Sequence, residues 1–344
     1  EKLSAIGLIA SWEKVGTFER PINMKTEGLT KASTVAEHNA LKFLGAEKLH
    51  QLGITGRGMT VGVIDTGIDY THAMFGGVGT EEGYKAVDPS KESAGYPSVK
   101  VVGGVDLVGT IYDSGSPEYT HRIPKPDMNP LDEAGHGTHV AGSIAGVGDG
   151  INSYDGMAKD ASLYAIKVFG ADGSTSDMVV IAGLEFAADP NGDGDLRDQL
   201  DIVNLSLGSG YGNPKILYAE AVKNLVQGGT VAVISAGNSG NVDYIVGAPG
   251  TSTEALSVAA SIDNGDHNWK YDASEIILPT ESVVVEAMEA ATTKPIAESN
   301  VKGDFVFIGI ADQDLTAEQK AILNGKVALI DRGVVNFNDK IKRA

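Results

Sequence analysis

The sequence predicts an α/β fold in which a doubly wound parallel sheet carries helices on both faces. Short apolar runs alternate with helical patterns from about residue 59 to residue 262. The runs are nearly continuous in apolar character, which is typical of strands buried on both faces. Polar residues follow several of these runs directly. Sheets of this kind carry their functional groups at the carboxyl ends of the strands.

Five apolar runs and three helical patterns make up this alternation. The predicted strands are Met59–Ile64, Val101–Val105, Leu163–Val168, Ile202–Leu205 and Val231–Ile234. The predicted helices are His136–Ala145, Asp177–Ala188 and Ile216–Val226. Ser174–Ser176 precedes the second helix and offers N-caps for it, because a serine oxygen can accept a hydrogen bond from a free N–H of the first turn. Strands separated by helices predict a parallel sheet.

The length of 344 residues indicates two domains, or one large domain with an insertion. Composition changes after Ser261, where a polar stretch precedes a second set of strand-like runs. These runs are Ser282–Val285, Asp304–Ile308 and Val327–Ile330, and a helical pattern follows at Asn338–Ala344. We predict an N-terminal extension at residues 1–50, an α/β domain at 51–269 and a mainly β module at 270–344.

Composition excludes several classes of function. The net charge is −19, which argues against binding to nucleic acid or to anionic membranes. No apolar run reaches the roughly 18 residues that indicate a membrane span. The chain has no cysteine, so it forms no disulfide and has neither a thiolate metal site nor a cysteine nucleophile.

Two polar side chains stand in glycine-rich turns after predicted strands. Asp65 ends the run Val63–Ile64, and Gly67 follows it closely, so the turn can aim the carboxylate into a cleft. Asn238 lies within Ile234–Gly240, where its amide can donate a hydrogen bond to the negative charge that develops during peptide hydrolysis. Each has an ordinary alternative, because parallel strands often end in Asp and because Asn is a common turn residue.

His136 stands between two glycines at the start of a predicted helix, and His139 follows one turn later. The dense Gly-His-Gly pattern favours a catalytic role for His136, whereas a structural role is the better interpretation of His139. A metal pair is a third possibility. Zinc-binding helices, however, space their histidines by four and carry a glutamate as general base, which is absent here.

Together, these segments resemble the subtilisin-like (S8) serine protease family. The order Asp, His and donor Asn along the edge of one parallel sheet is the order found in subtilisin. The matching segments are Val61–Asp69, Gly135–Gly146, Gly156–Phe169, Ile202–Gly208, Val231–Gly240 and Gly247–Gly250. They span most of residues 55–262. The resemblance implies a subtilisin-like catalytic domain at 51–269, and His136 argues against the sedolisin relatives, which use an acidic residue at that point.

The resemblance implies a role for each matched position. Asp65 would orient His136 and stabilise its imidazolium, His136 would be the general base and then the general acid, and Asn238 would donate to the oxyanion. The substrate-binding positions would be Ser206, Leu207 and Gly208 as one wall of the S1 pocket, Ala236 and Gly237 as the other wall, and Gly247 near the floor.

The nucleophilic serine of the family is missing from the sequence. It belongs to a Gly-Thr-Ser-x-Ala-x-Pro segment that no part of this chain matches. Ser252 follows Gly-Thr but lies too soon after Asn238, and we interpret it as a loop serine. The spacing of 71 residues between Asp65 and His136 is long for the family, so residues 76–134 include an insertion without an assigned role.

The tail resembles a protease-associated (PA) domain through the run Gly325–Gly333, which is followed by a phenylalanine and a helical pattern. Some large secreted subtilases carry this domain between the Asn and Ser segments. The resemblance therefore implies a partial PA domain at 270–344, with the nucleophile supplied by a later part of the same protein.

An acidic glycine-rich cluster follows the second predicted helix. Oxygen-bearing side chains at its positions 1, 3, 5 and 7, with Gly194 at position 6, match the start of an EF-hand calcium loop. These residues are Asp189, Asn191, Asp193 and Asp195. Position 12 is Leu200, so the cluster is not an EF-hand, although Asp198 or Asp201 could complete the shell. We favour a structural calcium site over a solvated acidic turn.

The leading hypothesis is a secreted or cell-surface endopeptidase that hydrolyses extended polypeptides. Two other classes stay open. One is an inactive relative that binds peptides, which requires the downstream serine to be replaced. The other is an α/β protein whose glycine-rich strand ends bind a small ligand.

Overall fold

The computed structural model describes residues 16–19, 40–148, 155–240, 242–261, 272–277, 282–287, 304–311, 313–331 and 343. The described residues up to Ser261 form one compact unit, and those from Asp272 onward form a second. None of the helices in these ranges is long and apolar enough to cross a lipid bilayer.

The first unit is built on a six-stranded sheet of order β3-β4-β2-β6-β7-β8, in which every neighbouring pair is parallel. Its strands are β2 (Thr60–Asp65), β3 (Val101–Asp106), β4 (Ser162–Lys167), β6 (Ile202–Leu205), β7 (Val231–Ser235) and β8 (Leu256–Val258). The predicted α/β class is confirmed. The sequence analysis missed β8, a three-residue strand whose side chains are all exposed.

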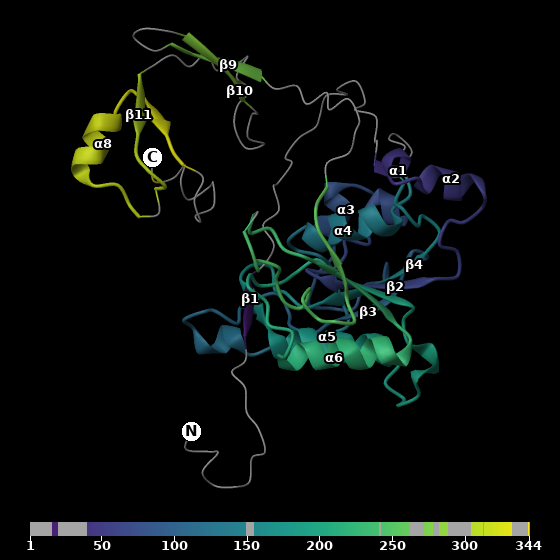
Figure 1. Ribbon diagram of the computed structural model, residues 1–344. Helices are drawn as coiled ribbons and strands as arrows, with labels where there is room; N and C mark the ends of the chain where they lie inside the picture. The colour runs from purple at the N-terminus through teal and green to yellow at the C-terminus, as the bar shows by residue number, and fades with distance from the viewer. Residues whose placement is uncertain are drawn as a thin grey trace. The chain divides into compact units, whose positions relative to one another are not determined.

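Helices cover both faces of this sheet (Figure 1). Helix α4 (His136–Ala145) packs on one face, and α5 (Asp177–Ala188) and α6 (Leu217–Gly228) pack on the other. Two apolar clusters fill the two layers. Val63 and Ala141 belong to one, and Ile64 and Leu184 belong to the other. Neighbouring residues of β2 thus point into different layers, which explains why its sequence is apolar without alternation.

The predicted N-cap at Ser174–Ser176 is confirmed in position, because Ser176 is the N-cap residue of α5, but the expected side-chain capping bond is absent. These residues form β5, which pairs antiparallel with β1 (Thr17–Glu19). Ser176 occupies the N-cap position of α5 but its side chain makes no capping bond, and its hydroxyl accepts from Tyr112 Oη at 3.2 Å. Strand pairing with a segment more than 150 residues earlier in the sequence took precedence over the local cap.

Short helices flank the sheet. They are α1 (Ala40–Phe43), α2 (Ala46–Gln51) and α3 (Glu81–Lys85), with 3-10 turns at Ala73–Phe75, Tyr119–Arg122 and Leu196–Asp198. His50 Nε2 lies 2.9 Å from the carbonyl oxygen of Met157. The end of the predicted N-terminal extension therefore contacts the α/β unit.

The second unit contains two strand pairs and one helix among its described residues. Strands β9 (Asp272–Ile277) and β10 (Ser282–Ala287) pair antiparallel, and β11 (Phe305–Phe307) and β12 (Val327–Leu329) pair parallel. Helix α8 (Ala317–Leu323) begins with a capping box between Thr316 and Gln319. The helical pattern predicted at 338–344 lies outside the described residues apart from Arg343, and the PA domain stays a prediction.

Candidate functional site

The carboxyl end of β2 and the first residue of α4 bring Asp65 and His136 together. Imidazole Nδ1 of His136 lies 2.7 Å from Oδ1 of Asp65, although 71 residues separate them. The Asp65 side chain is fully buried, whereas 18% of the His136 side chain is exposed. The pair is therefore closed on the carboxylate side and open to solvent on the imidazole side, as a general base facing a substrate requires.

Burial raises the pKa of the Asp65 carboxyl, while the hydrogen bond and positive charge of His136 act in the opposite direction. The backbone N–H of Thr66 also donates to Asp65 Oδ1 at 2.7 Å and favours the charged form. Oδ2 of Asp65 is buried and has no hydrogen-bond partner among the described residues. A protonated His136 is thus the main group that stabilises this carboxylate.

Asp132 anchors the start of α4 and was missed by the sequence analysis. Its Oδ1 accepts from the N–H groups of Ala134 and Gly135, and its Oδ2 accepts from the N–H and the hydroxyl of Thr138. A carboxylate at a helix N-terminus satisfies free N–H groups and complements the helix dipole. An acidic residue four positions before His136 was the signal that could have revealed it.

Thr66 joins the strand end to the helix start. Its hydroxyl donates to Asp132 Oδ1 at 2.8 Å and accepts from the N–H of Gly137 at 2.8 Å. Gly137 allows this contact because a Cβ there would lie 2.1 Å from the carbonyl oxygen of Gly67. The glycines around His136 therefore permit α4 to approach β2 closely enough for His136 to reach Asp65.

The predicted substrate-binding positions lie close together at the same edge of the sheet. The hydroxyl of Ser235 donates to the carbonyl of Leu207 at 3.2 Å, and the N–H of Gly247 donates to the carbonyl of Ala236 at 3.0 Å. Ser206 lies just beyond β6, and its hydroxyl accepts from Asn204 Nδ2 at 2.9 Å. Gly208 and Gly247 approach the backbone of Ala248 and Ser209, respectively, too closely for a side chain, and the nearest neighbour of a Cβ at Gly237 would be the N atom of Gly247 at 3.8 Å.

Asn238 lies in the turn after β7 and is exposed. The preceding Gly237 has a φ of 104°, a left-handed conformation that favours glycine and redirects the chain away from the strand. Because β6 lies between β2 and β7 in the sheet, Asp65 and Asn238 follow strands on either side of β6 at the carboxyl edge. The turn that carries Asn238 therefore lies at the same edge of the sheet as the Asp65–His136 pair.

Ser252 does not behave as a nucleophile. Only 5% of its surface is exposed, and its Oγ is buried without a hydrogen-bond partner among the described residues. A substrate carbonyl cannot reach a hydroxyl in this position. The geometry agrees with the interpretation of Ser252 as a loop serine.

The acidic loop after α5 satisfies its own backbone. Asp189 accepts from the N–H groups of Gly192, Asp193 and Gly194, and Asp193 accepts from that of Asp195. Asp195 also pairs with Arg197. Among the described residues, no group of three or more His, Asp or Glu side chains is arranged to hold a metal ion. The calcium site at this loop stays a prediction.

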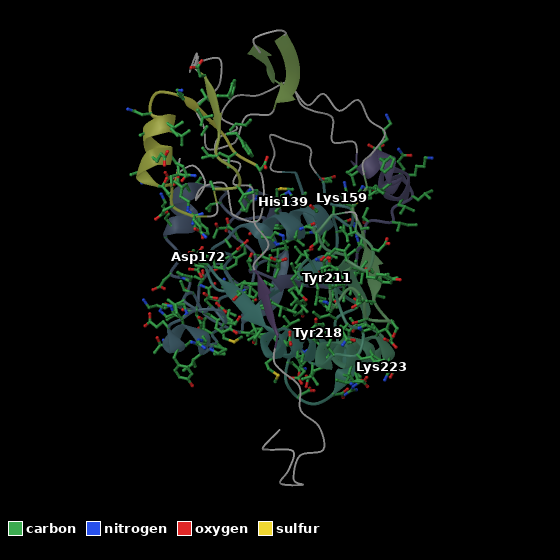
Figure 2. The ribbon with its side chains drawn as sticks, turned by 60° about the vertical axis from the view of Figure 1, so that its left-hand side comes forward. His139, Lys159, Asp172, Tyr211, Tyr218 and Lys223 are labelled. Carbon is green, nitrogen blue, oxygen red and sulfur yellow. The ribbon has the colours of Figure 1, made fainter. Side chains whose placement is uncertain are left out.

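His139 lies on α4 and is exposed (Figure 2). The metal-pair alternative for His136 and His139 has no support in the described ranges, which contain no cluster of potential ligands. A cavity of about 450 Å³ is lined by residues that include Tyr96 and Tyr164, and it does not include the Asp65–His136 pair. A smaller cavity of about 270 Å³ lies beside Asp69 and Tyr84.

Comparison with known proteins agrees with this geometry. The model of the subtilase family matches residues 56–322. The minor extracellular protease Vpr of Bacillus subtilis is 32% identical over 331 residues, which cover 94% of this chain and 34% of Vpr. The PII-type proteinase of Lacticaseibacillus paracasei is 31% identical over 84% of this chain and 16% of its own length. Subtilisin DY of Bacillus licheniformis is 31% identical over 71% of this chain and 72% of its own length.

The chain thus spans about a third of the length of Vpr and most of the length of subtilisin DY. The family match covers the sheet, the Asp65–His136 pair and the turn that carries Asn238. This chain belongs to the subtilase family.

Proposed function

We propose that this chain supplies the acid, the base and the oxyanion donor of a serine endopeptidase. The observation that carries the proposal is the 2.7 Å hydrogen bond between buried Asp65 and His136, whose side chain is 18% exposed. The protease names of its relatives support the same activity. Polypeptides are the proposed substrates, and the extracellular protease among the relatives supports a secreted or cell-surface location.

The proposed reaction proceeds through an acyl-enzyme. His136 removes the proton from a serine hydroxyl, which attacks the carbonyl carbon of the substrate. Asp65 stays ionised and stabilises the imidazolium, and Asn238 donates to the oxyanion. His136 then gives its proton to the leaving amine, and water hydrolyses the acyl-enzyme in a second round of the same steps.

The nucleophile of this reaction is proposed to lie in a later part of the same protein. This proposal follows from the buried Ser252 and from the coverage of only 34% of Vpr. The later part would bring its serine within hydrogen-bond reach of His136. A partial PA domain in the second unit would then lie between the Asn and Ser segments of the chain.

Fluorophosphonate labelling of the full-length protein tests the activity. We expect covalent labelling and peptide cleavage by the wild-type protein. His136→Ala should abolish both with little loss of fold, and His139→Ala is the matched control on the same helix. Activity of His136→Ala within tenfold of wild type would refute the assignment. Residues 1–344 expressed alone should not be labelled, and labelling of that fragment would return Ser252 to consideration.

A further inference from the structure

Lys167 is a fully buried lysine at the carboxyl end of β4, the strand next to β2 in the sheet. It pairs in register with Asp65 of β2 on one side and with Asp106 of β3 on the other. Its side chain has 0% exposure. Burying an ammonium group is unfavourable unless the group is paired and hydrogen-bonded, so the position needs a reason.

The contacts of Lys167 supply this reason. Its Nζ donates to the carbonyl oxygen of Thr66 at 2.9 Å and lies 3.7 Å from Glu133 Oε2. The positive charge of Lys167 also acts on Asp106, which is 1% exposed. Lys167 thus holds the turn after β2 by a hydrogen bond and faces carboxylates from two sides.

Thr66 connects this lysine to both members of the Asp65–His136 pair. Its N–H donates to Asp65 Oδ1, and its hydroxyl binds Asp132 and the N–H of Gly137, the residue after His136. The carbonyl is the remaining polar group of Thr66, and Lys167 binds it. Every polar group of Thr66 is therefore engaged in holding β2 and α4 in one arrangement.

We propose that Lys167 is a positioning residue for the Asp65–His136 pair. It fixes the Thr66 turn, and its charge offsets the carboxylates that surround the site. This inference rests on the proposed endopeptidase function only in the experiments that measure activity. Lys167 touches neither the imidazole nor a substrate in this assignment and acts through Thr66.

The charges around His136 determine the sign of the expected pH effect. The carboxylates are Asp65 on β2 and Asp132 and Glu133 before α4, while Lys167 on β4 is positive and also faces Asp106 on β3. Negative charges favour the imidazolium, and the positive charge opposes it. Removing the positive charge should therefore let His136 keep its proton to higher pH. The acid limb of the pH–activity profile should therefore move to higher pH.

The test compares Lys167→Met with the wild-type full-length protein. We expect kcat to fall by roughly 10- to 100-fold, as a small misplacement of catalytic groups does, with KM within about twofold. The acid limb should shift upward by about half a pH unit or more. Lys159→Met removes a partly exposed lysine that pairs with Asp155, and this control should leave the limb in place.

A second variant separates positioning from folding. Lys167→Met alone should lower the melting temperature, because it leaves buried Asp106 without the opposing charge. Lys167→Met with Asp106→Asn removes one buried charge of each sign, so it should recover much of that loss. Compared with Asp106→Asn alone, it should still show the lower kcat and the upward shift. Recovery of both kcat and the acid limb in the double variant would overturn the proposal and leave Lys167 a structural role.

NMR titration of the His136 ring makes the proposal independent of activity. In Lys167→Met the titration midpoint should move to higher pH, and an unchanged midpoint would overturn the proposal. An inactive wild-type protein would refute the proposed endopeptidase function. The titration would still decide the role of Lys167 in that case.

Discussion

In the buried layer around the Asp65–His136 pair, the residues are held in place mainly by the hydrogen bonds that they make with one another. Asp132 accepts five hydrogen bonds, from Thr66, Ala134, Gly135 and both donors of Thr138. Hydrogen bonds to a charged group are stronger than those between neutral groups. This network gives His136 a defined position before any substrate arrives, which is the condition for efficient general base catalysis.

Asp106 should make stability depend on pH. Burial raises the pKa of its carboxyl from 3.8 to about 6, against the opposing charge of Lys167 and the N–H groups of Gly109 and Val108. The stabilisation that the protonated Asp106 carboxyl contributes to the folded state is fully present below pH 3.8. It is lost as the pH rises through about 6. Asp106→Asn keeps an acceptor for both N–H groups, so it should gain up to about 3 kcal/mol over wild type between pH 4 and pH 8.

Denaturant unfolding of both proteins at several pH values checks this expectation. Asp88→Asn is the control. Lys91 lowers the pKa of that exposed carboxyl to about 2, so the pH range in which Asp88 changes the stability of the protein lies below pH 4. Parallel stability curves for wild type and Asp106→Asn between pH 4 and pH 8 would contradict the assignment.

Asn238 should affect turnover rather than binding. Asn238→Ala in the full-length protein is expected to lower kcat by about 10²–10³, the known effect of removing an oxyanion-hole donor in a protease of this family. KM should change little, because the donor acts on charge that develops only in the transition state. Asn224→Ala on the exposed side of α6 is the matched control. A variant that loses only affinity for substrate would contradict the oxyanion role.

At the scale of elements, the distance between α4 and β2 decides whether Asp65 and His136 meet. The helix begins at His136 and the strand ends at Asp65, so neither element alone contains the site. Glycine at position 137 is required for this approach, since the backbone of Gly67 lies where a side chain would go. Packing of α4 on the opposite face from α5 and α6 then keeps the pair on the carboxyl edge of the sheet.

Two glycines of α4 provide a matched pair of variants. Gly137→Ala should move α4 away from β2 and lower kcat by at least about tenfold, because its Cβ would lie 2.1 Å from Gly67 O. Gly142→Ala meets nothing within 4 Å and should stabilise the helix by up to about 1 kcal/mol. Kinetics and chemical unfolding measure both. Equal activity in the two variants would show that close approach of α4 is unimportant.

For the whole molecule, the excess of acidic residues is the dominant electrostatic feature. A net charge of −19 on 344 residues disfavours compact states through self-repulsion, and a bound cation or added salt relieves it. The acidic loop at 189–195 is the part of the chain where a specific cation effect is predicted. Its carboxylates accept hydrogen bonds from the loop backbone, which leaves lone pairs on them for a cation.

Calcium is expected to raise the melting temperature of the full-length protein. A ligand that binds only the folded state adds stability in proportion to the logarithm of its concentration. Removal with chelator should lower the melting temperature, and Asp193→Ala should abolish this response. Magnesium at equal ionic strength controls for general screening. Unchanged melting in excess chelator, or a normal response in Asp193→Ala, would contradict the predicted site.

The sequence by itself determined the α/β class, five strands of the main sheet and helices α4 and α5 with their observed bounds. Periodicity and composition are local properties, and these elements are set by local patterns. Its resemblance to the subtilisin-like family also implied that Asp65 and His136 are partners, and the structure places Oδ1 of Asp65 and Nδ1 of His136 2.7 Å apart. The roles of Asn238 and of the substrate-binding positions stay predictions, although the turns that carry them lie at the predicted edge.

Only the tertiary structure decided which side chains support the site. Asp132, Thr66 and Lys167 are joined by hydrogen bonds between residues 66 or 101 positions apart, and no local pattern encodes such partners. The same reason explains why Ser176 stands at the N-cap of α5 without a capping bond, since its strand pairs with β1 and its hydroxyl binds Tyr112. A residue's propensity is a property of the chain nearby, whereas its hydrogen-bond partner is set by the packing of α4 and β4 around β2.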